Sequence, residues 1–130
     1  MPAENSMKKK ILLAEDDGSM RRYVEITLRK ANYAVVAAED GLIAMQNALS
    51  EKFDAVVADA LMPNLSGHDL CRMLRQNPET QKIPFIILSG FEQNHSPEDL
   101  LADVYLVKGE NLKDDLLNTL SKFLAEEAKI

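Results

Sequence analysis

Five short apolar runs, each separated from the next by a longer amphipathic stretch, constrain the fold of this chain more than any other feature. The runs cover residues 11–14, 34–38, 55–58, 85–88 and 104–107 and are rich in branched side chains, as expected for strands buried on both faces. The stretches between them have helical spacing. Strand and helix therefore alternate along the chain, which predicts an α/β fold with a parallel sheet and helices on both faces.

The expected helices each carry one apolar stripe that we expect to be buried. The first three stripes are Met20, Tyr23, Val24, Thr27, Leu28 and Ala31, then Leu42, Met45, Ala48 and Leu49, then Leu70, Cys71 and Leu74. The last is the clearest and comprises Leu112, Leu116, Leu120, Phe123 and Leu124. Asp17 and Asp40 are expected to cap helices, and Ser96 before Pro97 indicates the start of a short helix before the fifth strand.

The length and charge of the chain exclude several classes of protein. A chain of 130 residues favours one domain, expected over residues 8–130, with residues 1–7 as a disordered or foreign N-terminal segment. The net charge of −6 has the wrong sign for direct binding to nucleic acid or an anionic membrane. Cys71, His68 and His95 lack the spacing of a structural zinc site. Without an export signal or a membrane-spanning run, we expect a cytoplasmic protein.

Polar side chains stand directly after all five apolar runs, and those after the second run are expected to form a turn and a helix cap. Glu15 and Asp16 follow the first run, and Asp59 follows the third. Ser89 follows the fourth run and Lys108 the fifth. In an open α/β sheet, ligands bind outside the carboxyl ends of the strands. If the first and third strands are neighbours, the three acids meet in one small pocket, and the serine and the lysine line its other wall.

This set of side chains is suited to binding a metal ion and transferring a phosphoryl group. Three carboxylates so close together repel one another unless a cation lies between them or a proton is shared. An all-oxygen ligand set in a shallow site favours a hard ion, and Mg²⁺ suits it better than Ca²⁺. A carboxylate beside Mg²⁺ and opposite a lysine can act as a nucleophile towards phosphorus. Asp59 is the expected nucleophile, because Glu15 and Asp16 form a pair suited to hold the metal.

Together these segments resemble the receiver domain of two-component response regulators, over the chain from residue 8 onward. The matching residues, in chain order, are Glu15, Asp16, Asp59, Met62, Pro63, Gly67, Ser89, Tyr105 and Lys108. The resemblance implies a flavodoxin-like, doubly wound five-stranded parallel sheet with strand order 2-1-3-4-5. It also implies a phosphorylation-dependent switch that takes its phosphoryl group from a sensor histidine kinase or a phosphotransfer protein.

The resemblance assigns roles to the residues of the pocket. It makes Asp59 the phosphoacceptor and also a Mg²⁺ ligand, and Asp16 a direct ligand of the metal. Glu15 would bind the metal through water, and the backbone carbonyl of Leu61 would join the metal shell. Lys108 matches the lysine that contacts the phosphate. By the same resemblance the protein is a phosphoacceptor that assists its own phosphotransfer and slow dephosphorylation, and is not otherwise an enzyme.

The resemblance also implies how the signal leaves the pocket. Ser89 and Tyr105 match the switch pair of the family, in which the hydroxyl moves to the phosphoryl group and the aromatic ring turns inward behind it. The partner surface would comprise the helix after the fourth strand, the fifth strand and the last helix. Whether phosphorylation also forms a homodimer stays open. The family usually has a cis proline after its lysine, whereas Gly109 stands here. A cis bond before a residue other than proline costs about 3 kcal/mol, so Lys108–Gly109 is trans unless its surroundings enforce the cis form.

Three other functions compete with this interpretation. A receiver-like scaffold that acts without phosphorylation stays compatible with the change at Gly109. A Mg²⁺-dependent phosphohydrolase would normally have a general acid two residues after its nucleophile, where Leu61 stands. A flavodoxin-like nucleotide or flavin binder would need backbone donors after the first strand, where Glu15 and Asp16 would repel an anion.

Overall fold

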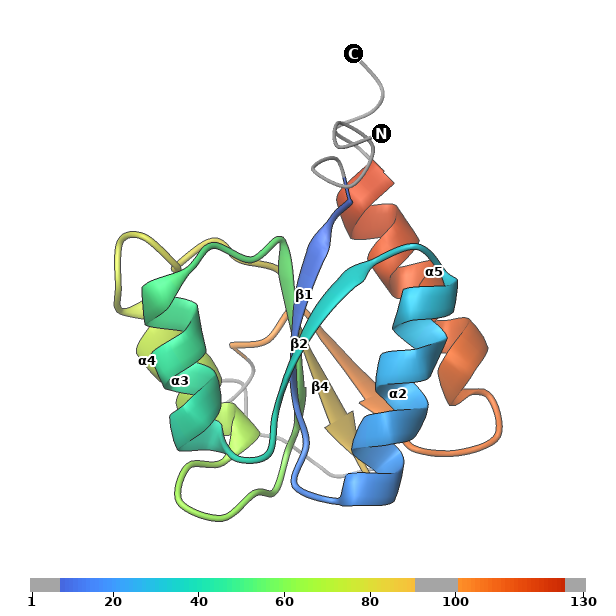
Figure 1. The fold of residues 1–130 in the computed structure, drawn as a ribbon. Coiled ribbons are helices and arrows are strands. Elements are labelled where there is room, and N and C mark those ends of the chain that lie inside the picture. Colours follow the sequence, from blue (N-terminus) through green and yellow to red (C-terminus); the bar gives the residue numbers. More distant parts are fainter. Residues whose placement is uncertain (1–7, 91–100, 126–130) are drawn as a thin grey trace.

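One five-stranded parallel sheet organises the protein, which we describe from a computed structural model over residues 8–90 and 101–125 (Figure 1). The strands, in the order β2-β1-β3-β4-β5, confirm the predicted doubly wound topology. They are β1 (Lys10–Ala14), β2 (Ala34–Ala38), β3 (Ala55–Asp59), β4 (Phe85–Ser89) and β5 (Val104–Val107). The helices are α2 (Gly18–Lys30), α3 (Gly41–Ser50), α4 (Gly67–Arg75) and α5 (Leu112–Leu124). The helix expected from Ser96 lies outside the described residues.

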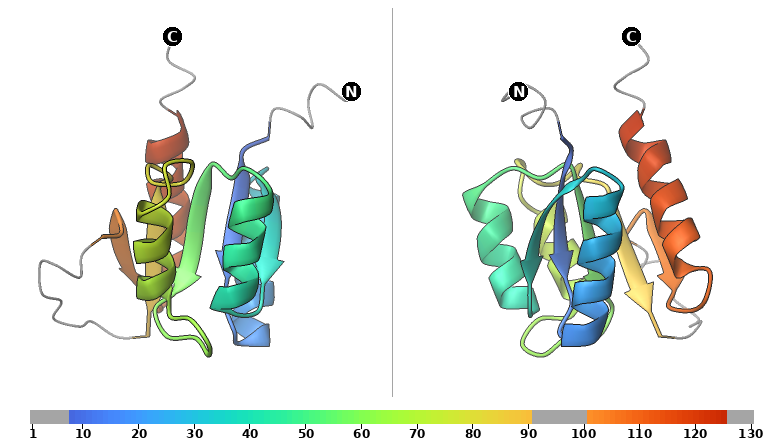
Figure 2. Two further views of the ribbon diagram at one scale, coloured as in Figure 1. Left: turned by 90° about the vertical axis from the view of Figure 1, so that its left-hand side faces the viewer. Right: turned by 45° about the vertical axis from the view of Figure 1, so that its right-hand side comes forward.

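The helices cover both faces of the sheet, and each face buries its own apolar cluster. α3 and α4 lie on one face, and α2 and α5 lie on the other (Figure 2). Because successive side chains of a strand point to opposite faces, Leu12 of β1 joins the first cluster while Ile11 and Leu13 join the second. β3 and β4 are buried along their whole length. No helix in residues 8–90 or 101–125 has both the length and the apolar character needed to cross a membrane.

The edge strands and two helices differ from the sequence prediction. β2 and β5 are only partly buried because each has a neighbouring strand on one side only, and Val107 is 41% exposed. α3 buries its small residues, which are Gly41, Ala44 and Ala48. Leu42 and Leu49 of the predicted stripe are exposed, as are Tyr23 of α2 and Ala31, the residue that follows α2. The first residue of α3 must lack a side chain, because a Cβ on Gly41 would lie 2.0 Å from the backbone oxygen of Leu65.

Side-chain caps fix where three of the helices begin. Asp17 and Asp40, both predicted as caps, each accept a hydrogen bond from the backbone amide three residues later, at 2.8 and 2.9 Å. Ser66 caps α4 in the same way, at 3.1 Å. These bonds satisfy amide groups that the first turn of a helix leaves without a partner. The caps therefore set the start of α2, next to the end of β1, and the start of α4, after the loop that follows β3.

The loop between β3 and α4 passes closely over the backbone of Asp59. The amide of Gly67 donates to the Ala60 carbonyl at 3.0 Å, and a Cβ on Gly67 would lie 2.2 Å from the Asp59 carbonyl oxygen. On the other side of the loop, Asn64 has a φ of 72° and donates its side-chain amide to the Asp40 carboxylate at 3.3 Å. The loop is thus held at Asn64 and at Gly67, and the contact at Gly67 restrains the backbone of Asp59.

We expect Gly67→Ala to lower the free energy of unfolding by about 1–3 kcal/mol, because the added methyl group forces the loop away from Asp59. Gly109→Ala is the matched control, since no atom lies within 4 Å of a Cβ built there. Its effect should stay within about 0.5 kcal/mol. Urea denaturation of the three proteins measures the difference. Equal stability of the two variants would contradict the close packing of the loop.

Candidate functional site

Three carboxylates meet at the carboxyl edge of the sheet, where β1 and β3 are neighbours. Ala14 and Ala58 are register partners in these strands, so the residues that follow them, Glu15 and Asp59, stand side by side. Asp16 follows in the turn to α2. Ligand oxygens of the three acids all lie within 4.8 Å of one another. The parallel register of two buried strands therefore brings together acids that are far apart in the sequence.

Burial makes Glu15 the most perturbed group of the site. Its side chain is buried, as is that of Asp59, whereas Asp16 is exposed. Desolvation raises the pKa of the Glu15 carboxyl from 4.5 to about 7, and the Asp59 charge adds to the rise. The Lys108 ammonium and the Asp17 amide, which donates to Glu15 Oε2 at 3.1 Å, act against it. Holding Glu15 ionised therefore costs free energy that a further cation would offset.

The Lys108 ammonium faces these acids. Its Nζ lies 2.9 Å from Glu15 Oε1 and 3.2 Å from Asp59 Oδ2. Burial alone would lower the pKa of Lys108, but the two carboxylates outweigh it and leave this pKa raised, so the lysine stays charged. Its backbone amide donates to the Ser89 carbonyl at 2.7 Å, which ties the lysine to β4. The described residues contain no cis peptide bond, so Lys108–Gly109 is trans, and the ammonium still reaches the acids.

The donor set of the site fits Mg²⁺. The converging ligands are all carboxylate oxygens, which hard divalent cations prefer. Glu15 Oε1 is in ion-pair contact with Lys108, but no described group gives this buried oxygen an aligned hydrogen bond. The single positive charge of Lys108 is also outnumbered by the three carboxylates. A hydrated divalent cation would supply both the missing donors and the missing positive charge.

Arg21 holds the turn that carries the acidic pair, a role that the sequence analysis missed. Its Nη1 donates to the backbone carbonyl of Glu15 at 2.9 Å and lies 3.4 Å from that of Asp16. Arg21 belongs to the first turns of α2, and its amide donates to the carbonyl of the cap residue Asp17 at 2.8 Å. One sequence feature, the predicted cap at Asp17, indicated that the first turns of α2 lie close to the end of β1.

The remaining predicted residues lie around this centre at different depths. Ser89 is buried at the end of β4, one position beyond Leu88, the register partner of Asp59. The side chain of Leu61, in the loop after Asp59, is 66% exposed. Tyr105 of β5 is partly buried, and its ring stacks on His68, a contact that the sequence analysis did not anticipate. Spacing gives no signal for such a pair, because it depends on how α4 lies over the sheet.

Comparison with protein families gives one match that spans most of the chain. The model of the response regulator receiver domain matches residues 11–120. Among curated proteins, response regulator ArlR of Staphylococcus saprophyticus is 33% identical over 108 residues, and ArlR of Staphylococcus aureus is 31% identical over 107. These alignments cover 81% and 80% of this chain and 48% of each relative. The chain thus spans about half the length of the curated relatives it matches.

Solved structures share the fold over nearly the whole chain. One is the receiver domain of sensor histidine kinase PA1611 from Pseudomonas aeruginosa, whose structure has a magnesium ion coordinated in the active site cleft. It has a TM-score of 0.82 at 26% identity, and the alignment covers 91% of this chain and 98% of that one. Chemotaxis response regulator CheY4 of Vibrio cholerae has a TM-score of 0.78 at 31% identity, covering 91% and 100%. Response regulator TrrA of Thermotoga maritima, in complex with Mg²⁺-BeF, has a TM-score of 0.79 at 29% identity, covering 89% and 99%.

We expect the affinity for Mg²⁺ to fall as the pH is lowered from 8 to 6. Protons compete with the metal for Glu15, whose raised pKa of about 7 lies in this window, and the ionised form is the one that binds. The affinity should change by about tenfold. Glu15→Gln removes the titrating group, so this variant should bind more weakly and with a much smaller pH dependence. Isothermal titration calorimetry at each pH measures both proteins, and equal pH dependences would exclude Glu15 from the site.

Proposed function

This chain belongs to the response regulator receiver family, and on that basis we propose that it is a signalling switch that is phosphorylated on Asp59. A histidine kinase or a phosphotransfer protein supplies the phosphoryl group, and phosphorylation changes the affinity for a downstream protein. The observation that carries the proposal is the set of contacts around Asp59. Two further acids lie within 4.8 Å of it, and the Lys108 ammonium is 3.2 Å from its carboxylate.

The phosphotransfer follows from the chemistry of these side chains. A carboxylate oxygen of Asp59 attacks the phosphorus of a phosphohistidine, the phosphorus–nitrogen bond breaks, and the departing imidazole takes up a proton from solvent. Lys108 offsets the charge that develops on the phosphoryl oxygens. Glu15, Asp16 and Asp59 would hold Mg²⁺ together with the backbone carbonyl of Leu61. A bound Mg²⁺ would supply positive charge beside the transferring oxygens. The product is an acyl phosphate on Asp59.

The new charge on Asp59 is detected by the switch pair. Ser89, buried at the end of the neighbouring strand, donates its hydroxyl to a phosphoryl oxygen. Tyr105 then turns inward behind it and alters the surface of β5. The downstream protein binds the face formed by β5, α5 and the helix expected after β4, whose residues lie outside the described part of the chain.

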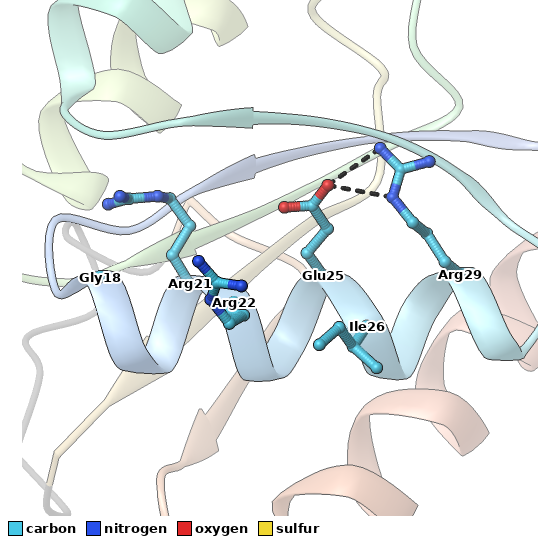
Figure 3. Close-up of a pocket in the computed structure, with 6 residues that line it drawn as sticks. All are labelled: Gly18, Arg21, Arg22, Glu25, Ile26 and Arg29. Atoms are coloured by element: carbon cyan, nitrogen blue, oxygen red, sulfur yellow. Dashed lines mark hydrogen bonds and ion pairs between the residues drawn. The ribbon is translucent and has the colours of Figure 1, made fainter.

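The exposed face of α2 suits the docking of the phosphodonor. A shallow groove of about 410 Å³ follows this face from the acidic turn, lined by Gly18, Arg21, Arg22, Glu25, Ile26 and Arg29 (Figure 3). Glu25 pairs with Arg29 at 2.9 Å, which leaves the face with a net positive charge. Tyr23 and Ile26 add apolar surface, at 47% and 45% exposure. In a chain with a net charge of −6, such a face favours an acidic surface on the kinase or phosphotransfer protein.

A phosphohydrolase has less support from the site. This alternative needs a group that protonates the leaving oxygen, two residues after the nucleophile. Leu61 stands at this position and is apolar and exposed. The protein is therefore proposed as a phosphoacceptor that assists its own phosphorylation and slow dephosphorylation, with no turnover of other phosphate esters.

Incubation with a small-molecule phosphodonor and Mg²⁺ tests the proposed phosphoacceptor. We expect intact mass spectrometry to show a gain of one phosphoryl group in the wild type and none in Asp59→Asn, because the amide is not a nucleophile. Asp54→Asn is the control, as a partly buried acid at the opposite end of β3. Phosphorylation of Asp59→Asn to the same extent as the wild type would refute the assignment.

Charge reversal on α2 tests the docking of the phosphodonor. We expect Arg22→Glu to slow transfer from a phosphotransfer protein that phosphorylates the wild type by about tenfold at low salt, because it repels an acidic partner. Transfer from a small-molecule donor should be unchanged. Lys52→Glu makes the same charge change on an exposed residue before β3, away from the acids, and should have little effect. Equal slowing by both variants would show that net charge, and not the α2 face, determines the rate.

A further inference from the structure

An aromatic contact links α4 to the edge strand β5. The rings of His68 and Tyr105 are stacked, with centroids 5.8 Å apart and planes inclined by 29°. His68 is the second residue of α4, and Tyr105 is the second residue of β5. Both side chains are partly exposed. The proposed phosphotransfer does not use His68, although its ring touches the aromatic member of the switch pair.

Tyr105 lies at the end of a row of residues that crosses the sheet. Ala58 of β3 is the register partner of Ile87 in β4, and Ile87 is the partner of Tyr105. All three pack in the cluster on the α3 and α4 side of the sheet. The next row carries Asp59, beside Leu88. The Tyr105 ring is therefore held from the sheet side by the row directly before the proposed phosphoacceptor.

The backbone directly before His68 packs tightly against the backbone of Asp59. Gly67, which precedes His68, donates its amide to the Ala60 carbonyl at 3.0 Å and would place a Cβ 2.2 Å from the Asp59 carbonyl oxygen. A displacement of the Asp59 backbone therefore presses directly on the first turn of α4. The ring stack would pass this displacement to β5, because stacked rings have a preferred geometry.

We propose that His68 is a positioning residue that holds the Tyr105 ring against α4 in the unphosphorylated protein. This inference rests on the proposed function, in which Tyr105 turns inward on phosphorylation. We take the stacked ring to be in its outward position, from which an inward turn breaks the stack with His68. The stack thus stabilises the unphosphorylated state only, and by linkage it must weaken the binding of any ligand that favours the phosphorylated state.

The experiment uses the Tyr23→Phe/Tyr33→Phe double variant as its parent protein. The chain has three tyrosines and no tryptophan, so tyrosine emission of this parent reports on Tyr105 alone. Beryllofluoride with Mg²⁺ serves as the mimic of a phosphorylated aspartate, and its titration gives the affinity. We expect the emission to change on binding, and His68→Leu to bind the mimic about two- to tenfold more tightly than the parent, in proportion to the lost stacking energy.

His68→Phe is the matched variant, because it keeps an aromatic ring at this position. It should bind the mimic with nearly the affinity of the parent, and thermal unfolding should show that both variants are folded. Equal or weaker binding by His68→Leu, with normal binding by the parent, overturns the inference and leaves the proposed function standing. Failure of the parent to bind the mimic overturns the proposed function and this inference with it. A merely structural role of His68 would not produce a gain in affinity.

Discussion

The charge balance between three carboxylates and one ammonium at the carboxyl edge of the sheet is the interaction on which the site depends. Glu15 and Asp59 are buried and adjacent, so their mutual repulsion is not screened by water. Lys108 contacts both and relieves part of this cost. The fold therefore maintains an excess of negative charge at one point, which favours a cation there and makes the site respond strongly to any added charge.

The scaffold around these side chains is tightly constrained. Arg21 holds the turn after β1, and the close approach of Gly67 holds the backbone of Asp59 under the loop after β3. The start of α3 packs on the same loop at Gly41. The backbone around Asp59 has little room to relax, so we propose that a change of charge on Asp59 is passed to the neighbouring elements. The stack of His68 and Tyr105 lies on one such route, from α4 to the edge strand.

Local patterns in the sequence predict the strands, whereas their order was implied by the resemblance to receiver domains. Given that order, the meeting of the three acids follows from one register. Apolar runs define β1 to β5, and residues that follow neighbouring parallel strands must lie close together. Packing that depends on the shapes of side chains could not be predicted from the sequence. Leu42 and Leu49 look like the core stripe of α3, but the sheet accepts only the small face of that helix. The reach of Arg21 and the contact of His68 depend on side-chain directions in three dimensions, which spacing along the chain does not encode.

The charge balance at the carboxyl edge is best tested by a crystal structure of the protein grown with beryllofluoride and with Mn²⁺ in place of Mg²⁺. The anomalous signal of manganese shows directly where the ion binds. We expect a single peak bonded to the carboxylates of Asp16 and Asp59, with beryllium on Asp59 and the Lys108 ammonium against a fluorine atom. A peak elsewhere, or carboxylates turned away from one another with beryllofluoride on a different residue, would contradict this expectation.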